Sequence, residues 1–170
     1  DAPADPPPEK LRAEASRIGI QTADDDRFDD IFFKIFLEKI EPQLGHPVPT
    51  ILYDYPVSMA ALARPTPLDP LLAERFEVYV CGLELANAFG ELTDAAEQRR
   101  RFEADMDLKE NLYGERYPVD ENFLAAVGLM PDAAGIALGI DRLVMLLAGV
   151  DDIEQTLWAP VEYSKLDPRA

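Results

Sequence analysis

The chain has 170 residues and a formal charge of −17 at neutral pH, so it fits one domain or part of one and lacks the cationic excess that binds nucleic-acid phosphates. One cysteine, Cys81, and one histidine, His46, exclude an internal disulfide framework, a multi-cysteine zinc site and paired-histidine metal sites. No apolar run approaches the roughly 20 residues of a membrane span, and a lone cysteine fits a reducing compartment, so we expect a cytoplasmic protein without a membrane partner.

The N-terminal part of the chain changes character near residue 24. Residues 1–23 begin with a run rich in proline and acids, which favours a tail or linker. Apolar residues at helical spacing over 28–40 then predict an amphipathic helix that ends before Pro42. A short apolar and aromatic run at 50–55 predicts a strand.

Residues 75–91 alternate between apolar and polar side chains, which predicts two strands joined by a turn at Gly82. Caps and periodicity farther along predict a helix over 94–113, a helix over 120–128, a strand over 133–140 and a helix over 141–148. Neighbouring strands joined by short turns favour antiparallel pairing, so the fold class is α+β, with a mixed, mostly antiparallel sheet flanked by helices. Three consecutive arginines, Arg99 to Arg101, are expected on a solvated face of the first of these helices.

Two glutamates, Glu77 and Glu84, lie seven residues apart across the predicted turn. Carboxylates inside strands need compensation for lost hydration, and Mg²⁺ with ATP phosphates would supply it. The spacing alone favours the alternative, in which both acids lie on the solvated face of a half-exposed sheet.

Asn87, Phe89 and Glu91 share one strand face because they are spaced by two. An amide, an aromatic ring and a carboxylate together suit an amine-bearing ligand, with the carboxylate pairing with the ammonium. A structural role for Phe89 fits the pattern equally well.

The run GIALGIDRL at 135–143 places small residues in a strand just before an arginine, Arg142, at the start of a helix. Glycine lets a flat ligand approach the backbone, and the guanidinium fork binds phosphate oxygens or stacks on a base. The alternative is a tight joint between strand and helix with Asp141 as the helix cap.

Taken together, residues 74–94 and 135–147 resemble the C-terminal catalytic half of class II lysyl-tRNA synthetases, and the second run resembles class II motif 3. The resemblance covers about 24–160. It implies a mostly antiparallel sheet flanked by helices and ATP-dependent adenylation of an amino acid. We therefore expect 24–163 to be the C-terminal portion of such a catalytic domain and 164–170 to be a tail.

Within that family, residues 55–79 are similar to the branch of ligases that modify elongation factor P. Residues 58–62 read SMAAL, where lysyl-tRNA synthetases usually carry a Glu followed by Ser-Pro-Leu, and Ala137 occupies a motif 3 position that is normally glycine in the synthetases. A methyl group in a pocket wall is worth about 1 to 3 kcal/mol of discrimination. The resemblance implies a preference for β-lysine over α-lysine.

The resemblance also implies roles for single residues. It assigns ATP and Mg²⁺ to Glu77 and Glu84, with ATP contacted by the catalytic Arg142. It assigns the lysine pocket to Asn87, Phe89, Glu91 and Ala137. A lysine amine of elongation factor P would then attack the adenylate carbonyl.

Class II motifs 1 and 2 are not found in this sequence, so the chain resembles half of an active site. We expect the isolated chain to be inactive and the full-length protein to be a homodimer. Two alternatives stay open: the C-terminal half of a lysyl-tRNA synthetase, whose acceptor is tRNA, and a non-catalytic binding module with a synthetase-like fold.

Overall fold

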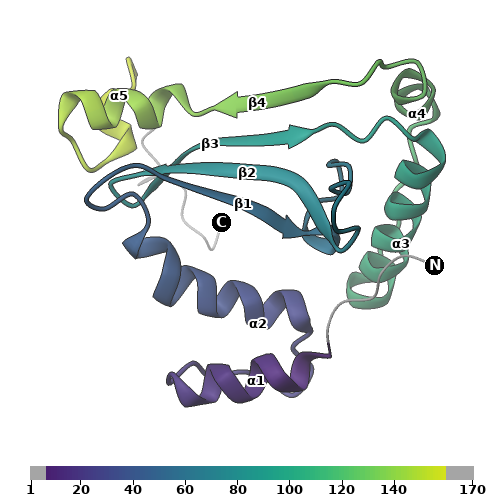
Figure 1. Ribbon diagram of the computed structural model, residues 1–170, viewed down its shortest axis with the longest axis horizontal. Helices are drawn as coiled ribbons and strands as arrows, with labels where there is room; N and C mark the ends of the chain where they lie inside the picture. Colours follow the sequence, from purple (N-terminus) through teal and green to yellow (C-terminus); the bar gives the residue numbers. More distant parts are fainter. Residues whose placement is uncertain (1–6, 160–170) are drawn as a thin grey trace, which may run out of the picture.

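A four-stranded antiparallel sheet lies at the centre of the computed structural model, which describes residues 7–159 (Figure 1). The strands pair in chain order and are β1 (Thr50–Pro56), β2 (Leu72–Val80), β3 (Leu83–Gly90) and β4 (Ala134–Leu138). The predicted α+β class and all four predicted strands are confirmed.

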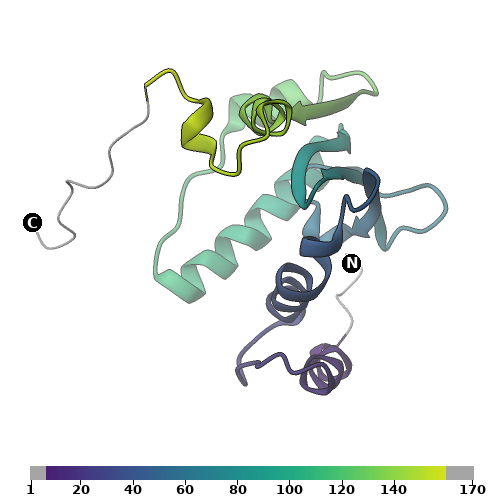
Figure 2. The same ribbon diagram turned by 90° about the vertical axis from the view of Figure 1, so that its left-hand side faces the viewer.

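Helices lie around the sheet at several positions. After the sheet's first three strands come α3 (Ala95–Tyr113) and α4 (Glu121–Val127) at one end, and β4 leads to α5 (Ile140–Ala148) at the other (Figures 1 and 2). Two short helical turns, η3 (Val57–Met59) and η4 (Ile153–Thr156), complete this part. Among the described helices, none has the length and apolar character that crossing a membrane requires.

Local capping sets the ends of α3 and α4 as predicted. The Asp94 carboxylate accepts hydrogen bonds from the backbone of residues 96 and 97, and Asp120 does the same for α4. Gly114 ends α3 in the left-handed conformation, which glycine adopts without strain. For α5, the alternative in which Asp141 caps the helix is wrong, because the cap position is Gly139.

The N-terminal segment corrects one expectation. Residues 8–17 of the predicted tail form α1 (Pro8–Arg17), whose first turn tolerates proline because its N–H groups need no partner within the helix. Its buried Ala15 packs with Ile20 and with Ile31 of α2 (Phe28–Ile35). The predicted helix over 28–40 is confirmed, with a π-helical end η1 (Phe36–Ile40) followed by η2 (Glu41–Gln43). The predicted tail at 164–170 lies outside the described residues.

The β2–β3 hairpin contains an irregularity that matters for function. Cys81 and Gly82, both at positive φ, form its two-residue turn. The register then runs from Tyr79 opposite Glu84 to Val78 opposite Ala86, so β3 carries one extra residue. This bulge reverses the alternation beyond Leu85, so Asn87 and Phe89 project to the side of the sheet on which Tyr79 and Glu84 lie.

Candidate functional site

One side of the sheet, which we call the polar face, carries the side chains of Arg75, Glu77, Tyr79, Glu84, Asn87 and Phe89. In the register of β2 and β3, Glu77 lies opposite Asn87, and Arg75 lies opposite Phe89. Residues paired across antiparallel strands project to the same side. Four of the side chains therefore meet at the centre of the sheet, and Glu84, opposite Tyr79, joins them at the turn end.

Glu77 is the buried centre of the polar face, with 5% of its surface exposed. Its Oε2 accepts hydrogen bonds from the hydroxyls of Tyr55 and of Tyr79, the latter at 2.6 Å. Its Oε1 accepts from Arg75 Nη2 at 2.6 Å and from Asn87 Nδ2 at 3.0 Å. Four hydrogen bonds match the full capacity of an ionised carboxylate. The expectation of a solvated Glu77 is therefore wrong, because these donors replace water.

Arg75 and the two tyrosines stabilise the buried charge of Glu77. Burial, followed by the hydrogen bond to Glu77, raises the pKa of the Tyr55 and Tyr79 hydroxyls above the ordinary value of 10, so both remain protonated donors. The Arg75 guanidinium lies 4.3 Å from the centre of the Tyr55 ring and donates to the Met59 carbonyl at 2.6 Å. The charge pair is thus largely buried, and each of its members has further hydrogen-bond partners.

Glu84 and Arg142 meet at the turn end of the polar face. Arg142 Nη1 donates to the Glu84 carbonyl at 2.7 Å and lies 3.7 Å from Glu84 Oε2. Asn87 Nδ2, which also donates to Glu77, lies 3.4 Å from Glu84 Oε1. The structure therefore brings both predicted carboxylates, the amide and the arginine together.

The start of α5 is attached to the bulge of β3. The Gly139 N–H donates to the Leu85 carbonyl at 2.8 Å, and Leu85 is the extra residue of the bulge. The same irregularity therefore brings Asn87 and Phe89 onto the polar face and fixes the helix that carries Arg142.

The other predicted pocket residues extend along the polar face toward the far end of β3. Ala137 of β4 lies opposite Asn87, and Gly135 lies opposite Phe89. Glu91 follows two residues after Phe89, and its carboxylate reaches over Gly135. Side chains of three chemical types thus follow one another in a row, from the amide through the ring to the carboxylate.

The two glutamates differ in their capacity to bind a cation. Glu77 uses all of its oxygen lone pairs, whereas Glu84 is partly exposed and, in the part of the chain that the structure describes, its carboxylate has only the two long contacts to Asn87 and Arg142. Within residues 7–159, no three acidic, histidine or cysteine side chains gather closely enough to hold a metal ion by themselves. Mg²⁺ often takes one or two carboxylates and completes its shell with water and substrate phosphates. Glu84 beside Arg142 fits a cation that arrives with a phosphorylated substrate.

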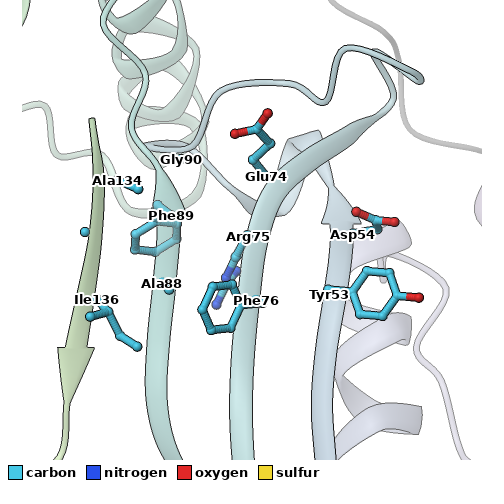
Figure 3. A pocket seen from close by; sticks show the side chains of 11 residues that line it. Tyr53, Asp54, Glu74, Arg75, Phe76, Ala88, Phe89, Gly90, Ala134 and Ile136 are labelled. Carbon is cyan, nitrogen blue, oxygen red and sulfur yellow. The ribbon is translucent and has the colours of Figure 1, made fainter. Parts of the chain in front are cut away.

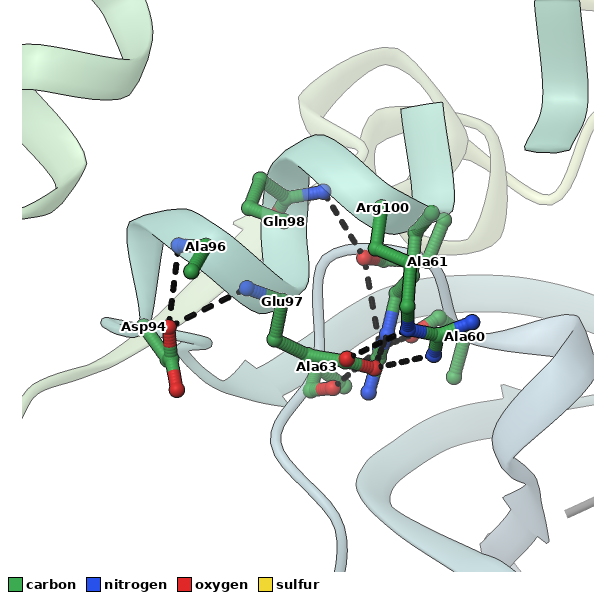
Figure 4. Close-up of polar contacts among 9 residues, drawn as sticks. Ala60, Ala61, Ala63, Asp94, Ala96, Glu97, Gln98 and Arg100 are labelled. Atoms are coloured by element: carbon green, nitrogen blue, oxygen red, sulfur yellow. Dashed lines mark hydrogen bonds and ion pairs between the residues drawn. The ribbon is translucent and has the colours of Figure 1, made fainter. Parts of the chain in front are cut away.

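The N-terminal half of α3 holds the segment 60–63 against the end of β3 (Figure 4). Gln98 donates to a carbonyl of this segment at 3.1 Å, and Arg101 Nη1 donates to three of its carbonyls at 2.9 to 3.3 Å. Ala63, the last residue of the segment, forms a β-bridge with Glu91. The expectation of a solvated arginine run is therefore wrong for Arg101, which is buried and helps to place Glu91.

Sequence reasoning missed several residues that shape the polar face. A spacing of two along β2 separates Arg75, Glu77 and Tyr79, so strand periodicity alone places these three side chains on one face. No comparable pattern indicates Tyr55 or Arg101, because each reaches the site from a segment distant in the sequence.

A groove of about 450 Å³ lies mainly on the opposite side of the sheet (Figure 3). Tyr53, Phe76 and Ile136 line it, together with backbone of the central strands. Figure 3 shows the Phe76 ring in front of β2, with the Arg75 guanidinium behind the strand. None of Glu77, Glu84 and Arg142 lines this groove, so the cluster on the polar face is a separate feature.

Comparison with known proteins gives a consistent assignment. The family model described as "tRNA synthetases class II (D, K and N)" matches residues 13–162. A protein of Proteus mirabilis (strain HI4320), named elongation factor P (R)-beta-lysine ligase, is 43% identical over 156 residues, covering 90% of this chain and 48% of that protein. A protein of the same name from Sodalis glossinidius (strain morsitans) is 44% identical over 142 residues, covering 83% of this chain and 43% of that protein. A third, from Haemophilus ducreyi (strain 35000HP / ATCC 700724), is 42% identical over 154 residues, with coverages of 90% and 47%.

The chain spans about half the length of the curated relatives it matches. The family match nevertheless extends over most of the chain, and it includes the hairpin with both glutamates and the segment with Arg142. The fold agrees with the architecture that the resemblance implied. This chain belongs to the class II tRNA synthetase family that comprises the D, K and N enzymes.

Proposed function

We propose that the full-length protein containing this chain activates β-lysine or lysine with Mg²⁺ and ATP as an aminoacyl adenylate and transfers it to a lysine of elongation factor P. One observation carries the proposal. Arg142 and the partly open Glu84 lie together on the polar face, in a chain 42–44% identical to relatives named elongation factor P (R)-beta-lysine ligase.

The phosphate end of the site is assigned to Arg142, Glu84 and Glu77. When bound, Mg²⁺ and ATP supply an electrophilic α-phosphate and a pyrophosphate leaving group. Among the described residues Arg142 donates only from Nη1, so its other donors are available to phosphate oxygens. Glu84 offers carboxylate oxygens to the cation, while Glu77 fixes Arg75 and Asn87 behind it and would need to release one donor to join. Positioning and charge neutralisation then assist attack by the substrate carboxylate.

The amino-acid end of the site is assigned to Asn87, Phe89, Glu91 and Ala137. Glu91 pairs with the ammonium of the substrate, and the Phe89 ring shields that contact from water. Ala137 lies opposite Asn87 and adds a methyl group to the floor of the pocket. That methyl group supports the choice of β-lysine, because one carbon in a pocket wall discriminates between substrates by about 1 to 3 kcal/mol.

The cellular setting is part of the same proposal. A single cysteine fits a reducing compartment, which supports a cytoplasmic location. The resemblance to class II enzymes implies a homodimer, and we assign both dimerisation and activity to the full-length protein rather than to the isolated chain.

Pyrophosphate exchange by the full-length protein tests the function. We expect exchange with β-lysine to exceed exchange with α-lysine. Removal of the guanidinium in R142A should lower the exchange rate by about 100-fold, a typical loss for one group that stabilises transition-state charge. The matched control is R116A, because Arg116 pairs with Asp107 and Glu110 on the exposed end of α3. Equal losses in the two variants would contradict the assignment of Arg142.

Two other outcomes would replace the proposed function. Exchange with α-lysine and none with β-lysine would identify a lysyl-tRNA synthetase, an alternative that the K in the family description favours. Absence of exchange with both amino acids would indicate a non-catalytic module with this fold.

A further inference from the structure

The Glu91 carboxylate differs from that of Glu77 in having no partner within residues 7–159. Among the described residues it accepts no hydrogen bond and forms no ion pair, although the residue is only partly exposed. Glu77, by contrast, accepts four hydrogen bonds. A partly buried carboxylate without a partner among the described residues is suited to a cationic group from a ligand.

The backbone at Glu91 is held on both sides, so only its side chain has freedom to move. Its N–H donates to the Ala133 carbonyl at 3.0 Å, and the residue forms a β-bridge with Ala63. The next residue, Leu92, donates to the Leu62 carbonyl at 2.9 Å. The position of the carboxylate is therefore decided by what surrounds the side chain.

Gly135 lies directly beneath this carboxylate. A Cβ atom added at Gly135 would lie 2.6 Å from Glu91 Oε1, which is closer than van der Waals radii allow. The φ angle of Gly135 is not in the left-handed region, so the backbone accepts alanine there and only space is limiting. The lack of a side chain at this position is what lets the carboxylate lie against β4.

Space for a displaced carboxylate exists in a cavity that Glu91 itself lines. This cavity of about 590 Å³ between the end of β3 and the helices α3 and α4 is lined by Glu91 and by apolar residues such as Val127 and Met130. A methyl group at Gly135 would therefore move the carboxylate toward this cavity without forcing the backbone apart.

We infer that Gly135 is a positioning residue, which places the Glu91 carboxylate at the amine-binding end of the site. The inference rests on the proposed function, in which Glu91 pairs with the substrate ammonium. Gly135 does not touch the ammonium in this arrangement. It acts through Glu91, because the absence of a Cβ atom leaves room for the carboxylate.

The experiment compares G135A, E91Q and the double variant in the full-length protein. In pyrophosphate exchange with the preferred lysine isomer, we expect G135A to raise the KM for the amino acid by about 10-fold, within the range typical of one misplaced methyl group. The KM for ATP should stay unchanged. In the E91Q background, G135A should change the KM for the amino acid by less than twofold, because the group through which it acts is gone.

Two controls separate positioning from damage to the fold. G128A makes the same substitution at the end of α4, where an added Cβ atom would lie 3.5 Å from its nearest neighbour, and it should leave every KM unchanged. The melting temperatures of G135A and the parent protein should agree within about 2 °C. The inference would be overturned if G135A left the KM for the amino acid unchanged. It would also be overturned if the KM of the double variant rose by the product of the two single effects.

A crystal structure of G135A distinguishes failure of this inference from failure of the proposed function. We expect the Glu91 carboxylate to leave β4 and turn toward the cavity beside α4. A carboxylate that keeps its place would overturn the inference, whichever substrate the protein activates. Displacement of the carboxylate in a protein that activates no lysine isomer would instead refute the proposed function.

Discussion

The two faces of the sheet have opposite characters, and the polar face is the better enclosed of the two. Glu77 is 5% exposed on the polar face, whereas Tyr53 and Ile136 on the other face are 66% and 62% exposed. Antiparallel sheets usually show the reverse, with an apolar face buried and a polar face solvated. The burial of the polar face is achieved by hydrogen bonds that join two tyrosines, an arginine and an amide to one carboxylate.

Because the polar face is buried and the apolar side chains are exposed, the two faces give different information about function. A buried polar cluster is costly unless each group is satisfied, so its presence is more informative about function than an exposed apolar residue is. Apolar side chains on the other face form a surface with the composition of an interaction site. Both faces therefore depart from what stability of a free-standing sheet alone would select.

The substitution E77Q should produce the largest effect on the free energy of unfolding. It retains the shape of the side chain but removes its charge, leaving the largely buried Arg75 without its ion-pair partner. Breaking a buried pair in this way costs about 3 kcal/mol or more. Urea denaturation monitored by circular dichroism measures the loss.

The neighbouring Glu74 provides the matched control for E77Q. Glu74 lies on the same strand as Glu77 but projects to the other side of the sheet, where it pairs with Arg64 and both side chains are about a third exposed. An ion pair of this kind contributes about 1 kcal/mol or less, so E74Q should have a small effect. Equal losses in E77Q and E74Q would show that the polar face is not the more strongly coupled one.

Glu97 provides a second, smaller effect and a dependence on pH. The hydrogen bond from Arg100, assisted by one from Arg101, lowers the pKa of Glu97 from 4.5 to about 2 despite opposing desolvation. Because the folded-state pKa is depressed, the ionised Glu97 stabilises the fold above the unfolded-state value of 4.5. This contribution is lost as the pH falls from 4.5 toward 2.

We therefore expect E97Q to lower the free energy of unfolding by about 1 kcal/mol at pH 7, a value reduced for the partial exposure of the carboxylate. The difference from the parent protein should shrink between pH 4.5 and pH 3. Denaturant titrations at several pH values measure it, with E121Q as the control for an exposed glutamate paired with Arg99. A constant difference at all pH values would contradict the role of the Glu97 charge.

Features encoded locally were predictable from the sequence. Alternation identified β2 and β3, and acidic caps located the starts of α3 and α4. The predicted tail at 8–17 was wrong because the proline-rich beginning concealed an apolar stripe in α1 that packs on α2. Proline at a helix start does not prevent the helix from forming.

Features that depend on distant partners were not predictable in this way. A two-residue turn and a spacing of seven put Glu77 and Glu84 on one face, but Asn87 and Phe89 join that face only because β3 contains a bulge at Leu85, and no residue in the hairpin indicates the bulge. The burial of Arg101 depends on carbonyls about 40 residues away. The grouping of the predicted site residues therefore came from the family resemblance, and their contacts came from the structure.

The smallest expected effect on the free energy of unfolding is that of a substitution on the face opposite the polar face, which carries Tyr53, Phe76 and Ile136 and which we call the apolar face. I136S replaces an exposed side chain of β4 and should change the free energy of unfolding of this chain by less than about 0.5 kcal/mol. The same substitution at the fully buried Ile31, between α1 and α2, should cost about 3 kcal/mol or more, because it leaves a cavity and a hydroxyl group in the core. Measured by urea denaturation, a loss for I136S as large as that for I31S would show that Ile136 is buried in solution. The apolar face would then be covered in the working protein, and the contrast between the two faces would be one of chemistry rather than of exposure.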